Sequence, residues 1–93
     1  MDTPEAQQIL RDHLKQYRTR ARAELLPLLR SPDVVETVGV SGVRYQLEVQ
    51  AVWDNAPNGN LRIIGAVDDG GLRAIVPLTD AFIVDPSGSL VGE

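Results

Sequence analysis

The sequence between residues 61 and 85 constrains the fold more than any other part of the chain. Two runs of alternating apolar residues meet at Asp69-Gly70, and an Asp-Gly pair between such runs is the strongest short-range signal for a β-hairpin. A tight hairpin turn needs positive φ angles, which Gly adopts freely and Asp tolerates. We therefore expect strands at residues 61–68 and 71–78, joined by a two-residue turn.

This turn sets a register in which Leu61 faces Leu78 and Ile64 faces Ile75. One face of the hairpin is then continuously apolar, while the other mixes isoleucines with charged residues. Gly65 lies in the middle of the apolar face, and a glycine inside a strand often marks the close approach of another backbone. We therefore expect a helix to cross the sheet at Gly65.

The composition is that of an ordinary globular protein. Ninety-three residues suit a single domain over 1–93, with 43% hydrophobic and 24% charged residues and no cysteine. No apolar run approaches the roughly 18–20 residues that span a bilayer, and the N-terminus lacks the basic-then-apolar order of a signal peptide. A cytoplasmic location is expected, with no membrane partner.

A helix is expected over residues 4–26. Asp2 or Thr3 can cap it, and Pro4 suits its first turn. Apolar residues recur there at spacings of three and four, which predicts a helix with one buried face. The stripe consists of Leu10, Leu14, Tyr17, Ala21, Leu25 and Leu28. Pro27 is expected to end or kink the helix, because proline lacks an N–H and its ring clashes with the preceding turn.

Two further alternating runs predict strands at residues 34–40 and 43–53, joined at Ser41-Gly42. In that register Val38 faces Tyr45 and Val34 faces Val49 on the core side. Glu36 then faces the apolar Leu47, which is a misfit. Either Glu36 lies beyond the edge of the helix, or the register differs.

The remaining segments complete the expected fold. Residues 82–85 predict a fifth strand, and residues 89–91 a short sixth strand or a tail. Short connections favour pairing between consecutive strands. The expected fold is α+β, with one long N-terminal helix packed on one face of an antiparallel meander of five to six strands in two layers.

The sequence carries no signature of catalysis, of cofactor binding or of a metal site. His13 is the single histidine, and the glycine-rich segments precede strands rather than a helix N-terminus. Asp68 and Asp69 suit a turn for backbone reasons, which explains them without chemistry. We therefore expect a protein that is not an enzyme and that needs no cofactor.

The most informative surface is the outer face of the expected sheet. Apolar residues interrupt an otherwise charged surface there, and monomers seldom leave large apolar patches in water. The interface hypothesis names Ile64, Ile75, Val52 and Ile83. It predicts a non-enzymatic interaction module that associates through this face or through a sheet edge. The module would form a homodimer or bind an unknown protein partner.

Two alternatives concern other residues. Trp53 and Asp68 are candidates for a pocket between helix and sheet that binds a small ligand or does acid-base chemistry. A basic stripe on the helix is a candidate for electrostatic binding, and it consists of Arg11, Lys15, Arg18 and Arg22. Residues 31–93 hold three basic against nine acidic side chains, which argues against nucleic acid as the main partner.

The run from Gly65 to Val84 resembles the C-terminal half of small uncharacterised bacterial proteins. That resemblance implies no activity, cofactor or catalytic residue. The expected topology, a helix followed by an antiparallel meander, is similar to that of cystatin-like and nuclear-transport-factor-like sheets. A likeness of topology does not carry function.

Overall fold

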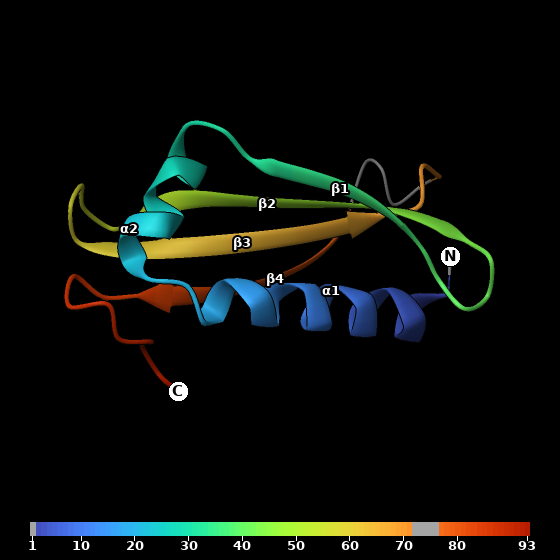
Figure 1. The fold of residues 1–93 in the computed structure, drawn as a ribbon, viewed down its shortest axis with the longest axis horizontal. Coiled ribbons are helices and arrows are strands. Elements are labelled where there is room, and N and C mark those ends of the chain that lie inside the picture. The colour runs from blue at the N-terminus through green and yellow to red at the C-terminus, as the bar shows by residue number, and fades with distance from the viewer. Residues whose placement is uncertain (1, 72–76) are drawn as a thin grey trace.

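The computed structural model describes residues 2–71 and 77–93 and has an α+β fold (Figure 1). A four-stranded antiparallel sheet has the strand order β1-β2-β3-β4. The helical segments lie along one face of the sheet, with α1 against β3 and β4 and η1 against β2. In chain order the elements are α1 (Thr3–Arg18), α2 (Arg22–Leu25), the 3-10 helix η1 (Leu26–Leu29), β1 (Asp33–Val38), β2 (Arg44–Asp54), β3 (Asn60–Asp68) and β4 (Leu78–Val84).

The expectation of one long helix over 4–26 was wrong in its second half. α1 begins as expected, with Asp2 Oδ1 accepting a hydrogen bond from the N–H of Glu5 at 3.1 Å. It ends at Arg18, and Ala21 is extended, with φ −65° and ψ 149°. The break turns the chain so that η1 lies against β2, and Leu25 and Leu28 are both buried. Burial of these two leucines outweighs the helix periodicity, which continues through the break.

The expectation of five to six strands was also wrong, because β3 pairs with a later segment than its hairpin turn suggests. Leu61 lies opposite Val84 rather than Leu78, and Val67 lies opposite Leu78. The single strand β4 thus replaces the predicted strand 82–85 and takes in the end of the predicted strand 71–78. The rest of that strand, with Ile75, falls on residues 72–76, which lie outside the described residues. Residues 89–91 form an isolated bridge to Val84 instead of a sixth strand.

The β1–β2 register differs from the expected one by one residue. Thr37, not Val38, lies opposite Tyr45, and Val35, not Glu36, lies opposite Leu47. The turn has three residues, since the N–H of Gly39 donates to the carbonyl of Val43 at 2.9 Å. The unfavourable pairing of Glu36 with Leu47 therefore came from the wrong expected register. In the observed register Glu36 lies opposite Gln46 on the outer face.

The core lies between the helices and the inner face of the sheet. Alternate residues of β2 and β3 are buried in it, as the strand patterns predicted. Gly65 marks the crossing point of α1, because a Cβ atom at Gly65 would lie 2.9 Å from methyl groups of Leu10 and Leu14. The expectation that a helix crosses the sheet at this glycine is confirmed.

Candidate functional site: the open edge strand and the outer sheet face

β1 is an edge strand that leaves apolar side chains exposed on both sides of the sheet. Val34 and Val38 point to the outer face and are 56% and 59% exposed, while Val35 points to the inner face and is 42% exposed. Val40, in the turn that follows, is fully exposed. A strand edge with this composition is a template for pairing with another chain.

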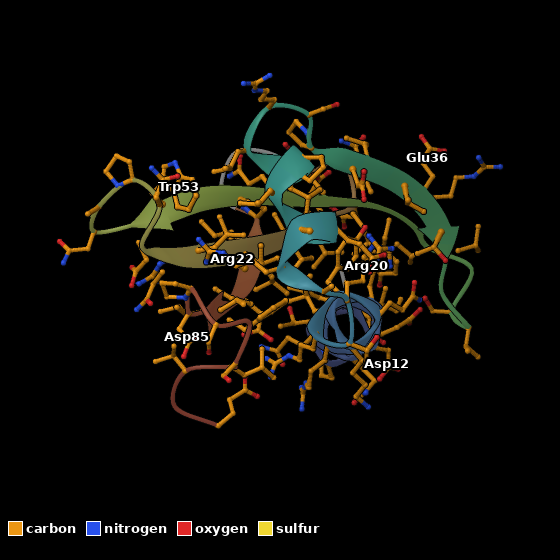
Figure 2. The ribbon with its side chains drawn as sticks, turned by 60° about the vertical axis from the view of Figure 1, so that its left-hand side comes forward. Asp12, Arg20, Arg22, Glu36, Trp53 and Asp85 are labelled. Atoms are coloured by element: carbon orange, nitrogen blue, oxygen red, sulfur yellow. The ribbon has the colours of Figure 1, made fainter. Side chains whose placement is uncertain are left out.

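The backbone of β1 also offers hydrogen-bonding groups at its free edge. Hydrogen-bonded and non-hydrogen-bonded pairs alternate along an antiparallel ladder. The N–H of Gly39 donates to the carbonyl of Val43, just before β2, so the alternation directs the N–H and C=O groups of Val34, Glu36 and Val38 away from β2. In the described sheet β1 pairs only with β2, and these groups face outward. Figure 2 shows Glu36 at the margin of the molecule, on the side of β1 away from α1.

A polar cluster fixes the start of β1 to the helical layer. The hydroxyl of Tyr17 donates to Asp33 Oδ2 at 2.8 Å, and the guanidinium of Arg20 stacks 4.1 Å from the Tyr17 ring. Burial, together with the hydrogen bond to Asp33, raises the pKa of Tyr17 to about 12. The ring of His13 meets that of Tyr17 edge to face at 5.4 Å. This cluster holds β1 in place while leaving its edge free.

His13 is set into this cluster with one nitrogen enclosed. Its Nε2 is buried without a hydrogen-bond partner among the described residues. Burial lowers the pKa of His13, the positive charge of Arg20 lowers it further, and the carboxylate of Asp33 opposes both. The environment therefore favours the neutral imidazole, which suits a packing role at the seam between α1 and β1.

Three of the four residues in the interface hypothesis come together on the outer sheet face. Ile64 lies opposite Gln50 on β2 and Ala81 on β4, which makes Val52 and Ile83 its diagonal neighbours. Arg62 stands between them and is bonded to Asp54 Oδ1 at 2.7 Å. Val52 is 40% exposed, whereas Ile64 and Ile83 are half-buried. Ile64 and Ile83 are therefore less exposed than Val34 and Val38 of β1.

The basic stripe does not form one continuous surface. Arg22 belongs to α2, where it donates to the carbonyls of Val84 and Asp85 at 3.4 and 3.2 Å. Arg18 contacts the carboxylate of Glu93 and lies over the Phe82 ring. On the exposed side of α1, Lys15 pairs with Asp12 at 3.3 Å, and Arg11 is exposed. Electrostatic binding through the stripe therefore rests on Arg11 and Lys15.

Trp53 and Asp68 do not share a pocket. They lie at opposite ends of the β2–β3 pair, with Trp53 facing the helices and Asp68 the outer side. Trp53 borders an apolar hollow of about 630 Å³ between α2, η1 and the end of β2, next to Arg22 and Arg30. Figure 2 shows Arg22 and Trp53 close together, and the guanidinium lies 5.6 Å from the ring centroid.

The carboxylates of Asp68 and Asp69 accept hydrogen bonds from backbone N–H groups in the turn after β3. Asp68 Oδ1 accepts from the N–H of Gly70 at 2.9 Å, and Asp69 Oδ1 accepts from the N–H of Gly71 at 3.0 Å. Hydrogen bonding from Gly71 lowers the pKa of Asp69. Both side chains stabilise a turn in which Gly70 has a φ of +82°.

Sequence reasoning missed the valines of β1 as candidate functional residues. It placed Val34 and Val38 on the core face because a two-residue turn at Ser41-Gly42 was assumed. The one signal that could have corrected this was the unfavourable pairing of Glu36 with Leu47. Moving the register by one residue removes that pairing and exposes the valines.

Comparison with known proteins adds no family to this description. Within the described residues, no group of three His, Cys, Asp or Glu side chains could hold a metal ion. No helix in that part of the chain is long and apolar enough to cross a membrane. No family model, curated protein or solved structure matches the sequence.

Proposed function

We propose that this protein is an interaction module that associates with a second copy of itself through the free edge of β1. The observation that carries the proposal is the exposure of Val34, Val35 and Val38 on both faces of an edge strand. A second β1 placed antiparallel beside the first would use the outward backbone groups and cover these valines on both faces. The sheet would then continue from one copy into the other.

The other edge of the sheet is covered at its end, which favours a closed dimer over a fibre. The C-terminal segment turns back beside the last residues of β4, where the N–H of Val91 donates to the carbonyl of Ile83 at 2.9 Å. A contact between two β1 edges uses the same surface on both copies, so a two-fold axis closes it. A fibre would need a second adhesive edge.

The test is a sedimentation experiment on two matched variants. Val38→Lys places a charge on the free edge, and Val52→Lys places the same charge on the outer face of the inner strand β2. Both valines are exposed, so both variants should fold. We expect Val38→Lys to weaken the dimer at least tenfold and Val52→Lys to change it little. The reverse result would move the interface to the outer face, and a wild-type monomer at several hundred micromolar would exclude self-association.

A second candidate function is supported by the hollow beside Trp53. Its lining combines an indole ring, leucine side chains and the guanidinium groups of Arg22 and Arg30, which suits a planar anion such as an aromatic carboxylate. Trp53 is the single tryptophan, so its fluorescence reports on this hollow alone. We expect saturable quenching by an aromatic carboxylate that Arg30→Gln weakens. Linear, unsaturable quenching would exclude the site.

A further inference from the structure

We infer that two β1 strands pair about a two-fold axis at Glu36, with Val34 of each copy opposite Val38 of the other. The inference deepens the self-association proposed above and rests on it. It concerns the register of the contact and the residue that limits its strength.

The backbone of β1 restricts the choice of register. The outward N–H and C=O groups belong to Val34, Glu36 and Val38, which all point their side chains to the outer face. In a continuous antiparallel sheet, directly opposite residues point to the same face. The two-fold axis must therefore pass through a residue of β1, and the central candidates are Val35, Glu36 and Thr37.

An axis at Val35 gives poor pairs on the outer face. It would place Val34 opposite Glu36 of the second copy twice, setting a valine against a carboxylate each time. It would also place Pro32 opposite Val38, and proline has no N–H to donate to the ladder.

An axis at Thr37 moves the contact off the strand. It would place Glu36 opposite Val38 twice and Val34 opposite Val40. Val40 belongs to the turn after β1 and not to the strand, so its backbone does not extend the ladder.

An axis at Glu36 pairs the exposed valines of the outer face with each other. Val34 faces Val38 of the second copy twice on the outer face, and Val35 faces Thr37 twice on the inner face. All five residues from 34 to 38 then have a partner within the other strand. The single unfavourable pair is Glu36 against Glu36 at the axis itself.

Glu36 therefore limits the affinity of the contact. Its neighbour across the β1–β2 pair is the uncharged Gln46, while Arg44 and Asp68 border the same shallow hollow on the outer face. Replacing Glu36 by glutamine removes the repulsion and keeps the shape. We expect Glu36→Gln to tighten the dimer about two- to fivefold. Glu48→Gln, the same change of charge one strand further in, should tighten it less.

The register is tested by disulfide trapping, for which the absence of cysteine makes the chain well suited. Opposite residues in a hydrogen-bonded antiparallel pair have Cα atoms about 5.5 Å apart, within the range that a disulfide spans. The single variants E36C, V35C and T37C are oxidised under identical conditions and resolved on non-reducing gels. Q50C, on the exposed outer face of β2, gives the background from random collision.

We expect E36C to form a covalent dimer well above the Q50C background, and V35C and T37C to form less. Trapping that is strongest at V35C or T37C would overturn the inferred axis while leaving self-association through β1 intact. Trapping at background level for all three, with a monomer in sedimentation of the wild-type protein, would overturn both. Glu36→Gln binding no tighter than wild type would also contradict an axis at Glu36.

Discussion

The two edge strands of the sheet, β1 and β4, differ in whether another segment of the chain pairs with their outer side. At the β4 edge the C-terminal segment folds back, with a bridge between Val84 and Leu90 and a hydrogen bond from the N–H of Asp85 to the carbonyl of Ser89 at 2.9 Å. At the β1 edge the described chain adds nothing beyond the strand, although Val34 and Val38 are exposed there. The open, apolar edge of β1, beside a β4 strand whose end is covered, is the difference on which the proposed self-association rests.

Both edges are nevertheless held by the helical layer. The hydroxyl of Tyr17 reaches Asp33 at the start of β1, while the guanidinium of Arg22 reaches the last carbonyls of β4. The two edges thus differ only on their outer side, where the C-terminal segment pairs with the end of β4 and no described segment pairs with β1. Four substitutions test this comparison, from the largest expected effect on stability to the smallest.

Gly65→Ala should disturb both edges at once. The new methyl group would lie 2.9 Å from side-chain atoms of Leu10 and Leu14, which pushes α1 away from the sheet and costs about 1–3 kcal/mol. Urea unfolding measures this loss. Adding Leu14→Ala creates space for the methyl, so the double variant should be more stable than the sum of the single effects predicts. Additive losses would show that α1 does not press on Gly65.

Tyr17→Phe should loosen the β1 edge and leave the β4 edge unchanged. It removes a hydrogen bond to a carboxylate that is 45% exposed, so we expect a loss of about 1 kcal/mol. Hydrogen exchange should show faster exchange in β1 than in the wild type. Equal acceleration in β4 would contradict this local role.

The same tyrosine gives a signal at high pH. Its pKa is raised to about 12, so its stabilising contribution is complete below pH 10 and is lost as the pH rises from 10 to 12. Burial also raises the pKa of Tyr45, the other tyrosine, so the transition of Tyr17 is read in Tyr45→Phe, where tyrosinate absorbance should appear only near pH 12.

Asp85→Ala should uncover the end of β4 with little effect on global stability. Asp85 Oδ1 accepts from the N–H of Ser87, the N–H of Ser89 and the hydroxyl of Ser87, at 2.9, 2.9 and 2.6 Å. Without it, the amide of Val91 should lose its protection from hydrogen exchange. Ser87→Ala, which removes only the hydroxyl bond, should have a smaller effect. Unchanged protection in both would show that the backbone alone holds the turn.

The pairing of the C-terminal segment with the end of β4 should weaken at low pH. Hydrogen bonds from Ser87 and Ser89 lower the pKa of Asp85 below its ordinary value of 3.8. Its contribution is therefore present above that value and is lost as the pH falls through the lowered pKa. Protection of Val91 in the wild type should follow this course.

His13→Gln should have the smallest effect. The pKa of His13 is lowered from 6.5, so the unfolded state binds the proton more readily and stability falls as the pH drops below 6.5. One group can contribute a slope of at most about 1.4 kcal/mol per pH unit. Unfolding at several pH values should show a shallower slope in His13→Gln, and an identical slope would assign the acid sensitivity to other groups.

Local patterns predicted the elements better than their partners. The alternation in β2 and β3 identified the buried face, and Gly65 was recognised as a crossing point. Both signals are carried by residues that are close together in the sequence. The break after Arg18 was missed, since the apolar spacing runs on through Ala21, and Ala21 itself is exposed. No local rule shows that Leu25 and Leu28 must be buried by a change of chain direction at this point.

The candidate site was predicted only in part. Val52, Ile64 and Ile83 were placed together from strand periodicity, and the structure makes them neighbours. The open edge of β1 was missed, since a shift of one residue exchanges the two faces of a strand. That shift depends on whether the turn before β2 has two or three residues, and a Ser-Gly pair permits either.

The sequence by itself determined the α+β class and the buried faces of the two central strands. These properties follow from periodicity and residue type. The tertiary structure alone decided that β3 pairs with residues 78–84, that the helix breaks at Ala21, and that the C-terminal segment covers the end of β4 while β1 pairs only with β2. Each of these outcomes depends on contacts between segments far apart in the chain, where total burial outweighs the local turn and helix signals.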